Sequence, residues 1–211
     1  MRLGLACSGG RPPQEVVDLL CAAGLCGRFD GVAAPALVEE PAPGGHVWLL
    51  ASAADVVGAC ERGALDAGVA GKDALLESEP AVHELLDLRA ARDALVYAAL
   101  QDPAAGRSRR ALPRVATRYV RVTRGFFADA GQQADVLEFD SPALAVRLGL
   151  ADGVVELRAR LDGAAAAGLQ ERAEVAACSA RLVCGRAAHT LAGAALEDLV
   201  ERLRAHLGGA A

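Results

Sequence analysis

Short apolar runs alternate with amphipathic segments along most of the 211-residue chain, and glycine, proline or serine marks most changes of pattern. Apolar runs bounded by such residues are typical of buried strands, whereas apolar positions three or four apart predict helices. The predicted strands are 3–7, 47–51, 64–71, 93–100, 114–119, 134–139, 154–157 and 175–184. The predicted helices are 14–23, 52–62, 74–77, 122–130, 143–148 and 191–207, with a further alanine-rich helix before residue 169.

Several predicted helices begin at residues that commonly serve as N-caps. Ser52 is a candidate N-cap, and Asp73 is expected to cap the short helix 74–77. Asp140 or Ser141 is expected to cap the next predicted start, with Pro142 at the first helical position. Strands that alternate with helices in this way predict a mainly parallel sheet, with ligands at the carboxyl ends of its strands.

A change of composition divides the chain. Residues 101–113 are rich in arginine, proline and glycine, which is typical of an exposed loop. Strand and helix patterns resume after this loop, and the strand at 175–184 is expected to return to the first half. We therefore predict an α/β fold with two lobes around a cleft, residues 1–90 with 178–211 forming one lobe and 91–177 the other.

Composition narrows the class of protein. Hydrophobic residues make up 53% of the chain, but much of this is alanine, and no apolar run approaches the roughly 18 residues of a membrane-spanning helix. The apolar segment 3–7 is too short for a signal peptide, so we expect a cytoplasmic protein. A net charge of -5 and only 3% aromatic residues disfavour a nucleic-acid surface. Small molecules are the expected ligands.

The cysteines and histidines form no metal-binding motif. Six cysteines occur without a C-x-x-C pair, and the four histidines do not cluster near them. In a cytosolic protein such thiols are expected to act mainly as small core residues. Cys7 alone lies beside an expected active-site loop, and no convincing Ser–His or Cys–His pair for nucleophilic catalysis is present.

Residues 149–169 carry the most informative chemistry. The predicted strand places Glu156 at its carboxyl end, where the carboxylate can accept hydrogen bonds from two ribose hydroxyls, and a following helix would offer backbone N–H groups to a phosphate. Replacement of Glu156 is therefore expected to weaken ligand binding with little effect on folding. However, Asp162 lies where an anion would bind, and no Ser or Thr lies between Glu156 and Leu169. The same pattern also fits any strand–helix unit of a parallel sheet.

Six segments, in order along nearly the whole chain, resemble the short-form catalytic subunit of ATP phosphoribosyltransferase, the first enzyme of histidine biosynthesis. They are AGKDALLE at 70–77, HELLDL at 83–88, RVATRY at 114–119, TRGFF at 123–127, LGLADGVVEL at 148–157 and CSARLV at 178–183. The resemblance implies two α/β lobes like those of type II periplasmic binding proteins, with ATP and phosphoribosyl pyrophosphate in the cleft. It also implies a separate regulatory subunit resembling histidyl-tRNA synthetase, within a homo- or hetero-oligomer.

The resemblance further implies the chemistry. Adenine N1 of ATP displaces pyrophosphate at C1 of the ribose and gives phosphoribosyl-ATP. Because the displacement passes through an oxocarbenium-like state, the protein acts mainly by positioning and charge stabilisation, and Mg²⁺ carried by the substrates neutralises the pyrophosphate.

The first set of implied site residues binds ATP and pyrophosphate. Arg11 and Arg92 match arginines that would meet nucleotide or pyrophosphate oxygens, and Asp73 matches an acidic position, although a plain helix cap explains Asp73 equally well. Where the family has proline and lysine before its first arginine, this chain has Ser8-Gly9, and where it has G-F-G before the second, this chain has Arg89-Ala90-Ala91.

The second set binds the phosphoribosyl group, and its members are Thr117, Arg118, Asp152, Glu156, Arg158, Arg160 and Gly163. The family motif E-T-G-x-T-L, whose threonines hold the 5′-phosphate, is replaced by ARLDGA at 159–164. Each lost charge-assisted hydrogen bond is worth about 1.5–3 kcal/mol, so two or three losses weaken binding roughly 10²- to 10⁵-fold. Arg158 and Arg160 restore positive charge, whereas Asp162 opposes it.

Three functions remain open from the sequence. The chain is an active phosphoribosyltransferase subunit, a catalytically impaired or repurposed paralogue that keeps the fold and the partner surface, or a small-molecule binding protein that uses the same cleft. The altered phosphate loop separates the first function from the other two.

Overall fold

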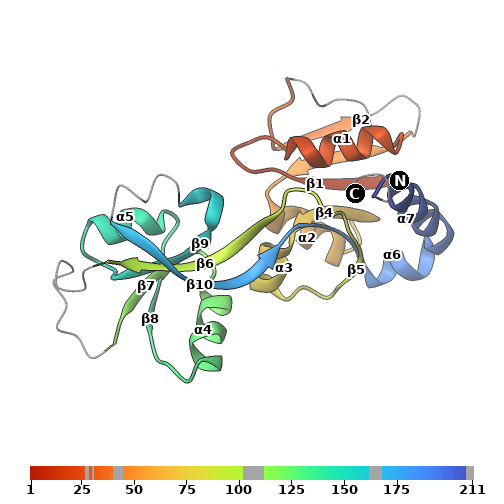
Figure 1. Cartoon of the computed structure of the whole chain (residues 1–211). Helices are drawn as coiled ribbons and strands as arrows, with labels where there is room; N and C mark the ends of the chain where they lie inside the picture. Colours follow the sequence, from red (N-terminus) through yellow and green to blue (C-terminus); the bar gives the residue numbers. More distant parts are fainter. Residues whose placement is uncertain (27–28, 30, 40–44, 102–111, 162–167, 208–211) are drawn as a thin grey trace. The chain divides into compact units, whose positions relative to one another are not determined.

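The computed structural model of the chain (Figure 1) describes all residues except 27–28, 30, 40–44, 102–111, 162–167 and 208–211. The chain forms two compact units, Met1–Arg92 with Ser179–Ala211 and Asp93–Cys178. The boundaries expected from the sequence, 1–90 with 178–211 and 91–177, differ from these by one or two residues at each crossing. Among the described residues, no helix is both long and apolar enough to cross a bilayer.

Unit 1 contains a six-stranded sheet in the order β2-β3-β1-β4-β11-β5. Its strands are β1 Arg2–Ala6, β2 Ala36–Glu39, β3 Val47–Ala51, β4 Ala67–Gly71, β5 Val82–Asp87 and β11 Ala180–Gly185. Its helices are α1 Gln14–Ala22, α2 Ala53–Glu61, α3 Lys72–Ser78, α6 Arg186–Leu191 and α7 Gly193–Leu207. Helices α1 and α7 share one buried cluster with the strands, whereas α2 belongs to another.

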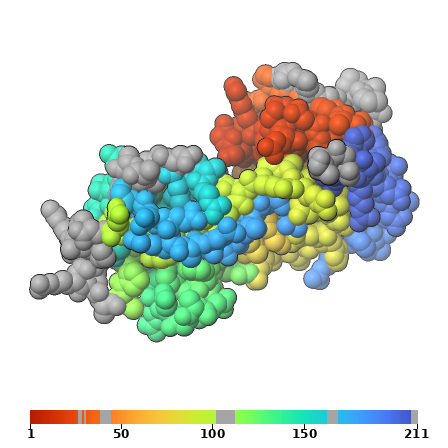
Figure 2. Space-filling view, viewed as in Figure 1, coloured from red at the N-terminus to blue at the C-terminus, as the bar shows by residue number. Residues whose placement is uncertain are grey.

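Glycines allow α2 to pack tightly on the sheet of unit 1. A β-carbon on Gly4 or Gly68 would lie 2.7 Å from the Val56 side chain of α2, so a larger residue at either position would push the helix away. In the other buried cluster, α7 contributes residues such as Leu199 and Leu203, and this helix belongs to the dark blue surface in Figure 2. These contacts hold the parallel strands β3, β1 and β4 between helices.

The prediction of a mainly parallel sheet is wrong for unit 1. In the described part of this unit, the β1–β3 and β1–β4 pairs are parallel, while β2, β11 and β5 join the sheet in antiparallel pairs. Strands β2 and β5 were not predicted as strands, because they are edge strands with mixed polar and apolar residues. The predicted strand 175–184 is in fact two strands, β10 and β11, divided at Ser179 where the chain passes between the units.

The sequence also missed one helix and assigned one cap wrongly. The predicted helix 191–207 corresponds to α7, which begins two residues later, whereas α6 was not predicted. The N-cap of α3 is Gly71, and Asp73 lies in the first turn of that helix, so Asp73 is not its cap. Ser52 does cap α2, since its hydroxyl accepts the Asp55 N–H, whereas Ser141 before α5 makes no capping hydrogen bond with its side chain.

Unit 2 contains a five-stranded sheet in the order β10-β6-β9-β7-β8. Its elements are β6 Asp93–Leu100, β7 Arg114–Thr117, α4 Val120–Asp129, β8 Asp135–Glu138, α5 Pro142–Arg147, β9 Gly153–Leu157, the 3-10 turn η1 Arg158–Arg160 and β10 Leu169–Cys178. Side chains alternate along the strands: Ala116 and Val154 cluster with α5, and Val115 and Val155 with Phe127 of α4. Among the residues that the structure describes, each face of this sheet therefore packs against one helix. The expected alanine-rich helix falls largely on 162–167, outside the described residues.

Candidate functional site

The carboxyl ends of two parallel strands meet at one edge of the unit 2 sheet. Strands β7 and β9 pair in parallel, with Thr117 opposite Val155, so the residues that follow them leave the sheet together. Strand β6 runs antiparallel to β9, which brings its first residue, Asp93, to the same edge. Ligand sites in α/β sheets typically lie at such an edge. We call it the carboxyl edge of unit 2.

Glu156 is a buried carboxylate between two arginines at this edge, with an exposed fraction of 3%. Its Oε2 accepts a hydrogen bond from Nη2 of Arg118 at 2.9 Å. Its Oε1 accepts the Leu157 N–H at 2.9 Å and lies 3.7 Å from Nη1 of Arg160. Removal of this carboxylate would take a buried hydrogen-bond acceptor away from Arg118 and from the Leu157 N–H. The expectation that Glu156 matters little for folding is therefore not supported by its surroundings.

The two arginines remain accessible, because 36% of each side chain is exposed. Burial alone would lower the pKa of Arg118, but the hydrogen bond and the charge of Glu156 raise it, so the guanidinium stays protonated. Nε of Arg118 is buried and has no hydrogen-bond partner among the described residues. Guanidiniums placed at the carboxyl ends of strands suit a phosphate, because they form strong hydrogen bonds with its oxygens.

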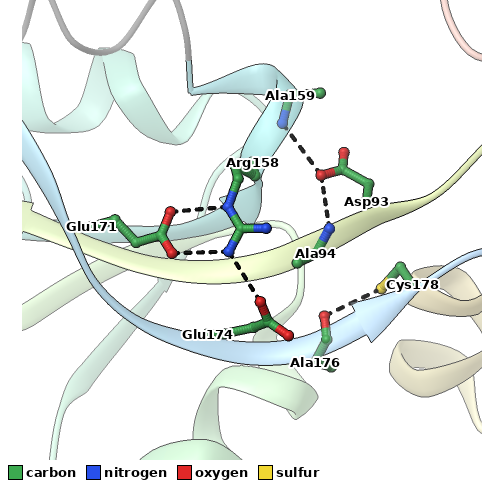
Figure 3. Close-up of polar contacts among 8 residues, drawn as sticks. All are labelled: Asp93, Ala94, Arg158, Ala159, Glu171, Glu174, Ala176 and Cys178. Carbon is green, nitrogen blue, oxygen red and sulfur yellow. Dashed lines mark hydrogen bonds and ion pairs between the residues drawn. The ribbon is translucent and has the colours of Figure 1, made fainter.

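Arg158 lies only two residues before Arg160 but faces other partners (Figure 3). Its Nε and Nη2 donate to the Glu171 carboxylate at 3.0 and 2.9 Å, and Nη2 also donates to Glu174 at 3.0 Å. These hydrogen bonds raise the pKa of Arg158 further and lower the pKa of Glu171. Two carboxylates on β10 therefore neutralise Arg158, which leaves it poorly suited to bind an anion.

The backbone of η1 is also tied to β6. Asp93 accepts the N–H of Ala94 through Oδ1 at 2.7 Å, and the same oxygen lies 3.4 Å from the backbone nitrogen of Ala159 (Figure 3). Contacts from β6 and β10 thus hold the turn whose last residue is Arg160.

Thr117 is fully buried, unlike a residue that faces a ligand. Its hydroxyl donates to the Val155 carbonyl at 2.8 Å and accepts the Tyr119 N–H at 2.9 Å. These two bonds connect β7 to β9 and shape the turn into α4. Thr117 therefore supports Arg118, the next residue, from within the sheet.

Asp152 lies at the opposite end of β9 from Glu156. Its Oδ2 accepts the backbone N–H of Arg114 at 2.9 Å, where β7 begins. Four residues of extended strand span about 13 Å, so the structure does not bring Asp152 together with the other phosphoribosyl candidates. Gly163 and Asp162 lie outside the described residues.

In unit 1, Arg11 belongs to a tight turn after β1. The Ser8 N–H donates to the Arg11 carbonyl at 2.9 Å, and Gly9 and Gly10 have φ of 60° and 80°. Because only glycine adopts such angles readily, the two glycines make this turn possible. A cavity of about 260 Å³ adjoins the turn, and its lining includes Arg11, Gln14, Val17, Phe29 and Val32.

The structure places the turn that carries Arg92 against the first turn of α1. Glu15 of α1 accepts the Ala91 N–H at 2.7 Å, and Nε of Arg92 donates to the Arg89 carbonyl at 2.9 Å. Asp73 follows β4, the parallel neighbour of β1, so it lies at the same edge of the sheet as the Arg11 turn. All three candidates for ATP and pyrophosphate binding therefore belong to the carboxyl edge of unit 1.

Neither Cys7, which follows β1, nor Cys60, near the end of α2, is an activated nucleophile. Burial raises the pKa of the Cys7 thiol, although a backbone hydrogen bond with Ala51 opposes the shift. Burial and the neighbouring Cys184 raise the pKa of Cys60 to about 12. A reactive cysteine needs the opposite shift, so covalent catalysis by these thiols is disfavoured.

Sequence reasoning missed the acidic residues that hold these arginines and turns. The missed residues are Glu15, Asp87, Asp93, Glu171 and Glu174. Most of their contacts join segments far apart in the chain, and no local motif in the sequence marks them.

Comparison with known proteins identifies the family. The model of the family described as HisG, ATP phosphoribosyltransferase, matches residues 52–205. The ATP phosphoribosyltransferase of Psychrobacter arcticus is 36% identical over 204 residues, covering 96% of this chain and 87% of the relative. That of Geobacillus kaustophilus is 35% identical and covers 96% and 97%.

Solved structures share the fold at lower sequence identity. The ATP phosphoribosyl transferase (HisG:HisZ) complex from Thermotoga maritima aligns with a TM-score of 0.77 at 20% identity, covering 99% of this chain and 98% of that chain. The periplasmic aliphatic sulphonate binding protein SsuA from Escherichia coli aligns with a TM-score of 0.61 at 12% identity, covering 98% and 72%. The two-lobed fold of type II periplasmic binding proteins is therefore confirmed. By its sequence matches, the chain belongs to the ATP phosphoribosyltransferase family.

Proposed function

We propose that this chain is the catalytic subunit of an ATP phosphoribosyltransferase and performs the first step of histidine biosynthesis. The bond between C1 of the ribose and the pyrophosphate oxygen breaks, a bond from C1 to adenine N1 of ATP forms, and phosphoribosyl-ATP and pyrophosphate are released. Besides family membership, the observation that carries this proposal is the buried Glu156 between Arg118 and Arg160 at the carboxyl edge of unit 2.

The phosphoribosyl group binds at that edge. Arg118 and Arg160 present their guanidiniums to the 5′-phosphate and replace the hydroxyl donors that this chain lacks. Glu156 holds both arginines, and its Oε1, which has one short hydrogen bond, can also accept a ribose hydroxyl. Fixed charges of this kind stabilise the transition state because they need no reorganisation during the reaction.

Arg11, Arg92 and Asp73 serve ATP and the leaving pyrophosphate at the carboxyl edge of unit 1. The two arginines neutralise phosphate oxygens, and the Gly9-Gly10 turn lets backbone approach them closely.

Mg²⁺ is carried by the substrates in this proposal. Among the described residues, no group of three or more His, Cys, Asp or Glu side chains is placed to hold a metal ion. Mg²⁺ commonly binds through substrate phosphates and one or two carboxylates rather than in a protein cage. The ion would neutralise charge on the pyrophosphate as it leaves.

A regulatory partner is part of the proposal. The Thermotoga maritima relative in structure is named as a HisG:HisZ complex, and the present chain aligns with 98% of the matched chain of that complex. We propose that this chain likewise acts in the cytoplasm within an oligomer that contains a regulatory subunit resembling histidyl-tRNA synthetase.

Reconstitution tests the function. Purified chain is mixed with ATP, phosphoribosyl pyrophosphate, Mg²⁺ and the regulatory subunit, and phosphoribosyl-ATP is measured by chromatography. Product that requires the chain, both substrates and an intact Glu156 supports the proposal. A folded chain that binds ATP but forms no product with the partner would contradict it and favour the impaired paralogue, since residues 159–161 lack the hydroxyls of the family motif.

A further inference from the structure

Residues 88–92 form a turn with two residues in an unfavourable backbone conformation. Arg89 has φ of 52° and Ala91 has φ of 48°, although neither residue is glycine. In this left-handed region the β-carbon crowds the backbone carbonyl, so residues other than glycine, Asn and Asp seldom occupy it. Contacts with the surrounding structure must offset the energetic cost of two such residues in one turn.

Two carboxylates from other elements supply that compensation. Oδ1 of Asp87 accepts the Arg89 N–H at 2.9 Å. Oε2 of Glu15, in the first turn of α1, accepts the Ala91 N–H at 2.7 Å. Each left-handed residue thus donates its own N–H to a carboxylate, and such charge-assisted bonds are stronger than neutral ones.

Between these residues the turn is held by the core and by β11. Leu88 and Ala90 are buried, with exposed fractions of 1% and 9%. The Leu88 N–H donates to the Ala180 carbonyl, and the Ala180 N–H donates to the Ala90 carbonyl, each at 2.9 Å. These contacts fix the positions of residues 88 and 90. They therefore restrict the backbone angles of Arg89 and Ala91.

Arg92 depends on this turn for its position. It is the last residue of the first segment of unit 1, and its Nε donates to the Arg89 carbonyl at 2.9 Å. Relaxation of Arg89 or Ala91 to ordinary angles would turn that carbonyl and release the guanidinium.

We infer that Glu15 and Asp87 are positioning residues, which hold the left-handed turn so that Arg92 faces the anionic groups of the nucleotide substrate. The identity of that substrate rests on the proposed function, whereas the coupling between Glu15 and residue 91 does not. Glu15 acts through the Ala91 N–H, whereas Asp87 also accepts the Ser179 hydroxyl at 2.8 Å and pairs with Arg181 at 3.2 Å.

Glycine at position 91 gives a direct test. Glycine adopts positive φ without crowding, so Ala91→Gly should remove the need for Glu15. The four proteins are wild type, Glu15→Ala, Ala91→Gly and the double variant. We expect Glu15→Ala to lower the Tm by about 2–4 °C in the wild-type background and by less than half of that in the Ala91→Gly background. Equal losses in both backgrounds would overturn the inference.

Kinetics in the reconstituted assay separate positioning from stability alone. Glu15→Ala should raise KM for ATP at least about fivefold, with kcat within about twofold of wild type, and Ala91→Gly should restore KM in the double variant. Glu15→Gln keeps an acceptor oxygen and should stay close to wild type. A lower Tm with unchanged KM in Glu15→Ala would show a purely structural role and contradict the inference.

Glu61 is the matched control. Its Oε1 accepts the Ala81 N–H at 3.0 Å, so it is also a carboxylate that binds a backbone N–H in unit 1. Glu61→Ala should lower the Tm without changing KM for ATP, and Ala91→Gly should not rescue it. If wild-type protein forms no phosphoribosyl-ATP, the proposed function fails, and the Tm coupling alone still decides whether Glu15 holds the turn.

Discussion

The two ends of β9 carry similar acidic residues in very different roles. Asp152 precedes the strand and accepts the backbone N–H of Arg114, so its charge serves the pairing of β7 with β9. Glu156 lies near the other end, buried between Arg118 and Arg160. The resemblance implied a phosphoribosyl-binding role for both residues, and they lie four positions apart.

The difference shows that the place of a residue on a strand matters more than its type. Side chains an even number of residues apart share a face of the sheet, but four residues carry the chain from one edge of this short strand to the other. Ligands of α/β sheets typically bind where the carboxyl ends of parallel strands meet. An acidic residue at the amino-terminal end of such a strand can therefore stabilise strand pairing, whereas one at the carboxyl end can hold ligand-binding groups.

A similar contrast separates Arg158 from Arg160. The first bonds Glu171 and Glu174 on β10, whereas the second lies near Glu156, which also accepts a hydrogen bond from Arg118. Exposed ion pairs contribute little to the free energy of unfolding, so we assign Arg158 to the local order of η1 rather than to overall stability.

Loss of Glu156 should have the largest effect. Glu156→Ala removes the carboxylate that contacts both Arg118 and Arg160, and we expect kcat/KM to fall at least about 100-fold, which corresponds to about 2.7 kcal/mol. The free energy of unfolding should also fall, by about 1–3 kcal/mol, because a buried partner is removed. Steady-state kinetics and urea unfolding measure the two effects. Activity within tenfold of wild type would place the phosphoribosyl site elsewhere.

Loss of Arg118 should have a smaller effect on binding. Arg118→Ala should raise KM for phosphoribosyl pyrophosphate about tenfold, or about 1.4 kcal/mol, since one of two guanidiniums remains. Arg118→Lys keeps the charge but not the planar fork, so it should recover only part of the loss. Full activity of the alanine variant, measured under saturating ATP, would show that Arg118 only supports the fold.

Substitution at the other end of β9 should leave substrate binding unchanged. Asp152→Asn keeps an acceptor for the Arg114 N–H but loses its charge, so we expect a loss of about 1 kcal/mol and a Tm lower by about 2–4 °C. KM for both substrates should remain within twofold. A tenfold rise in KM for phosphoribosyl pyrophosphate would mean that Asp152 contacts ligand after all.

The sequence predicted the strands that are apolar along their length. Strands β3 and β6 have the predicted bounds, and β9 differs by one residue, because short apolar runs between glycine and polar residues leave little freedom. Strands β2 and β5 were missed because edge strands need no continuous apolar run.

At the candidate site, local reasoning placed Glu156 at the end of a strand but could not foresee its partners. Arg118 is 38 residues away in sequence. The hydrogen bonds from Arg158 to Glu171 form only when β10 pairs with β6. The left-handed backbone conformations of Arg89 and Ala91 could not be predicted either, because arginine and alanine favour other conformations. Contacts that depend on tertiary pairing leave no periodic signal in the sequence.

The affinity for phosphoribosyl pyrophosphate of a matched pair of variants, Arg160→Ala and Arg158→Ala, tests the central claim most directly. Titration calorimetry with Mg²⁺ at fixed ionic strength should give a Kd at least about tenfold higher than wild type for Arg160→Ala. The Kd for Arg158→Ala should stay within about threefold, because its guanidinium is already neutralised by Glu171 and Glu174. Equal losses for the two variants, or a larger loss for Arg158→Ala, would contradict the assignment of the phosphate to Arg118 and Arg160.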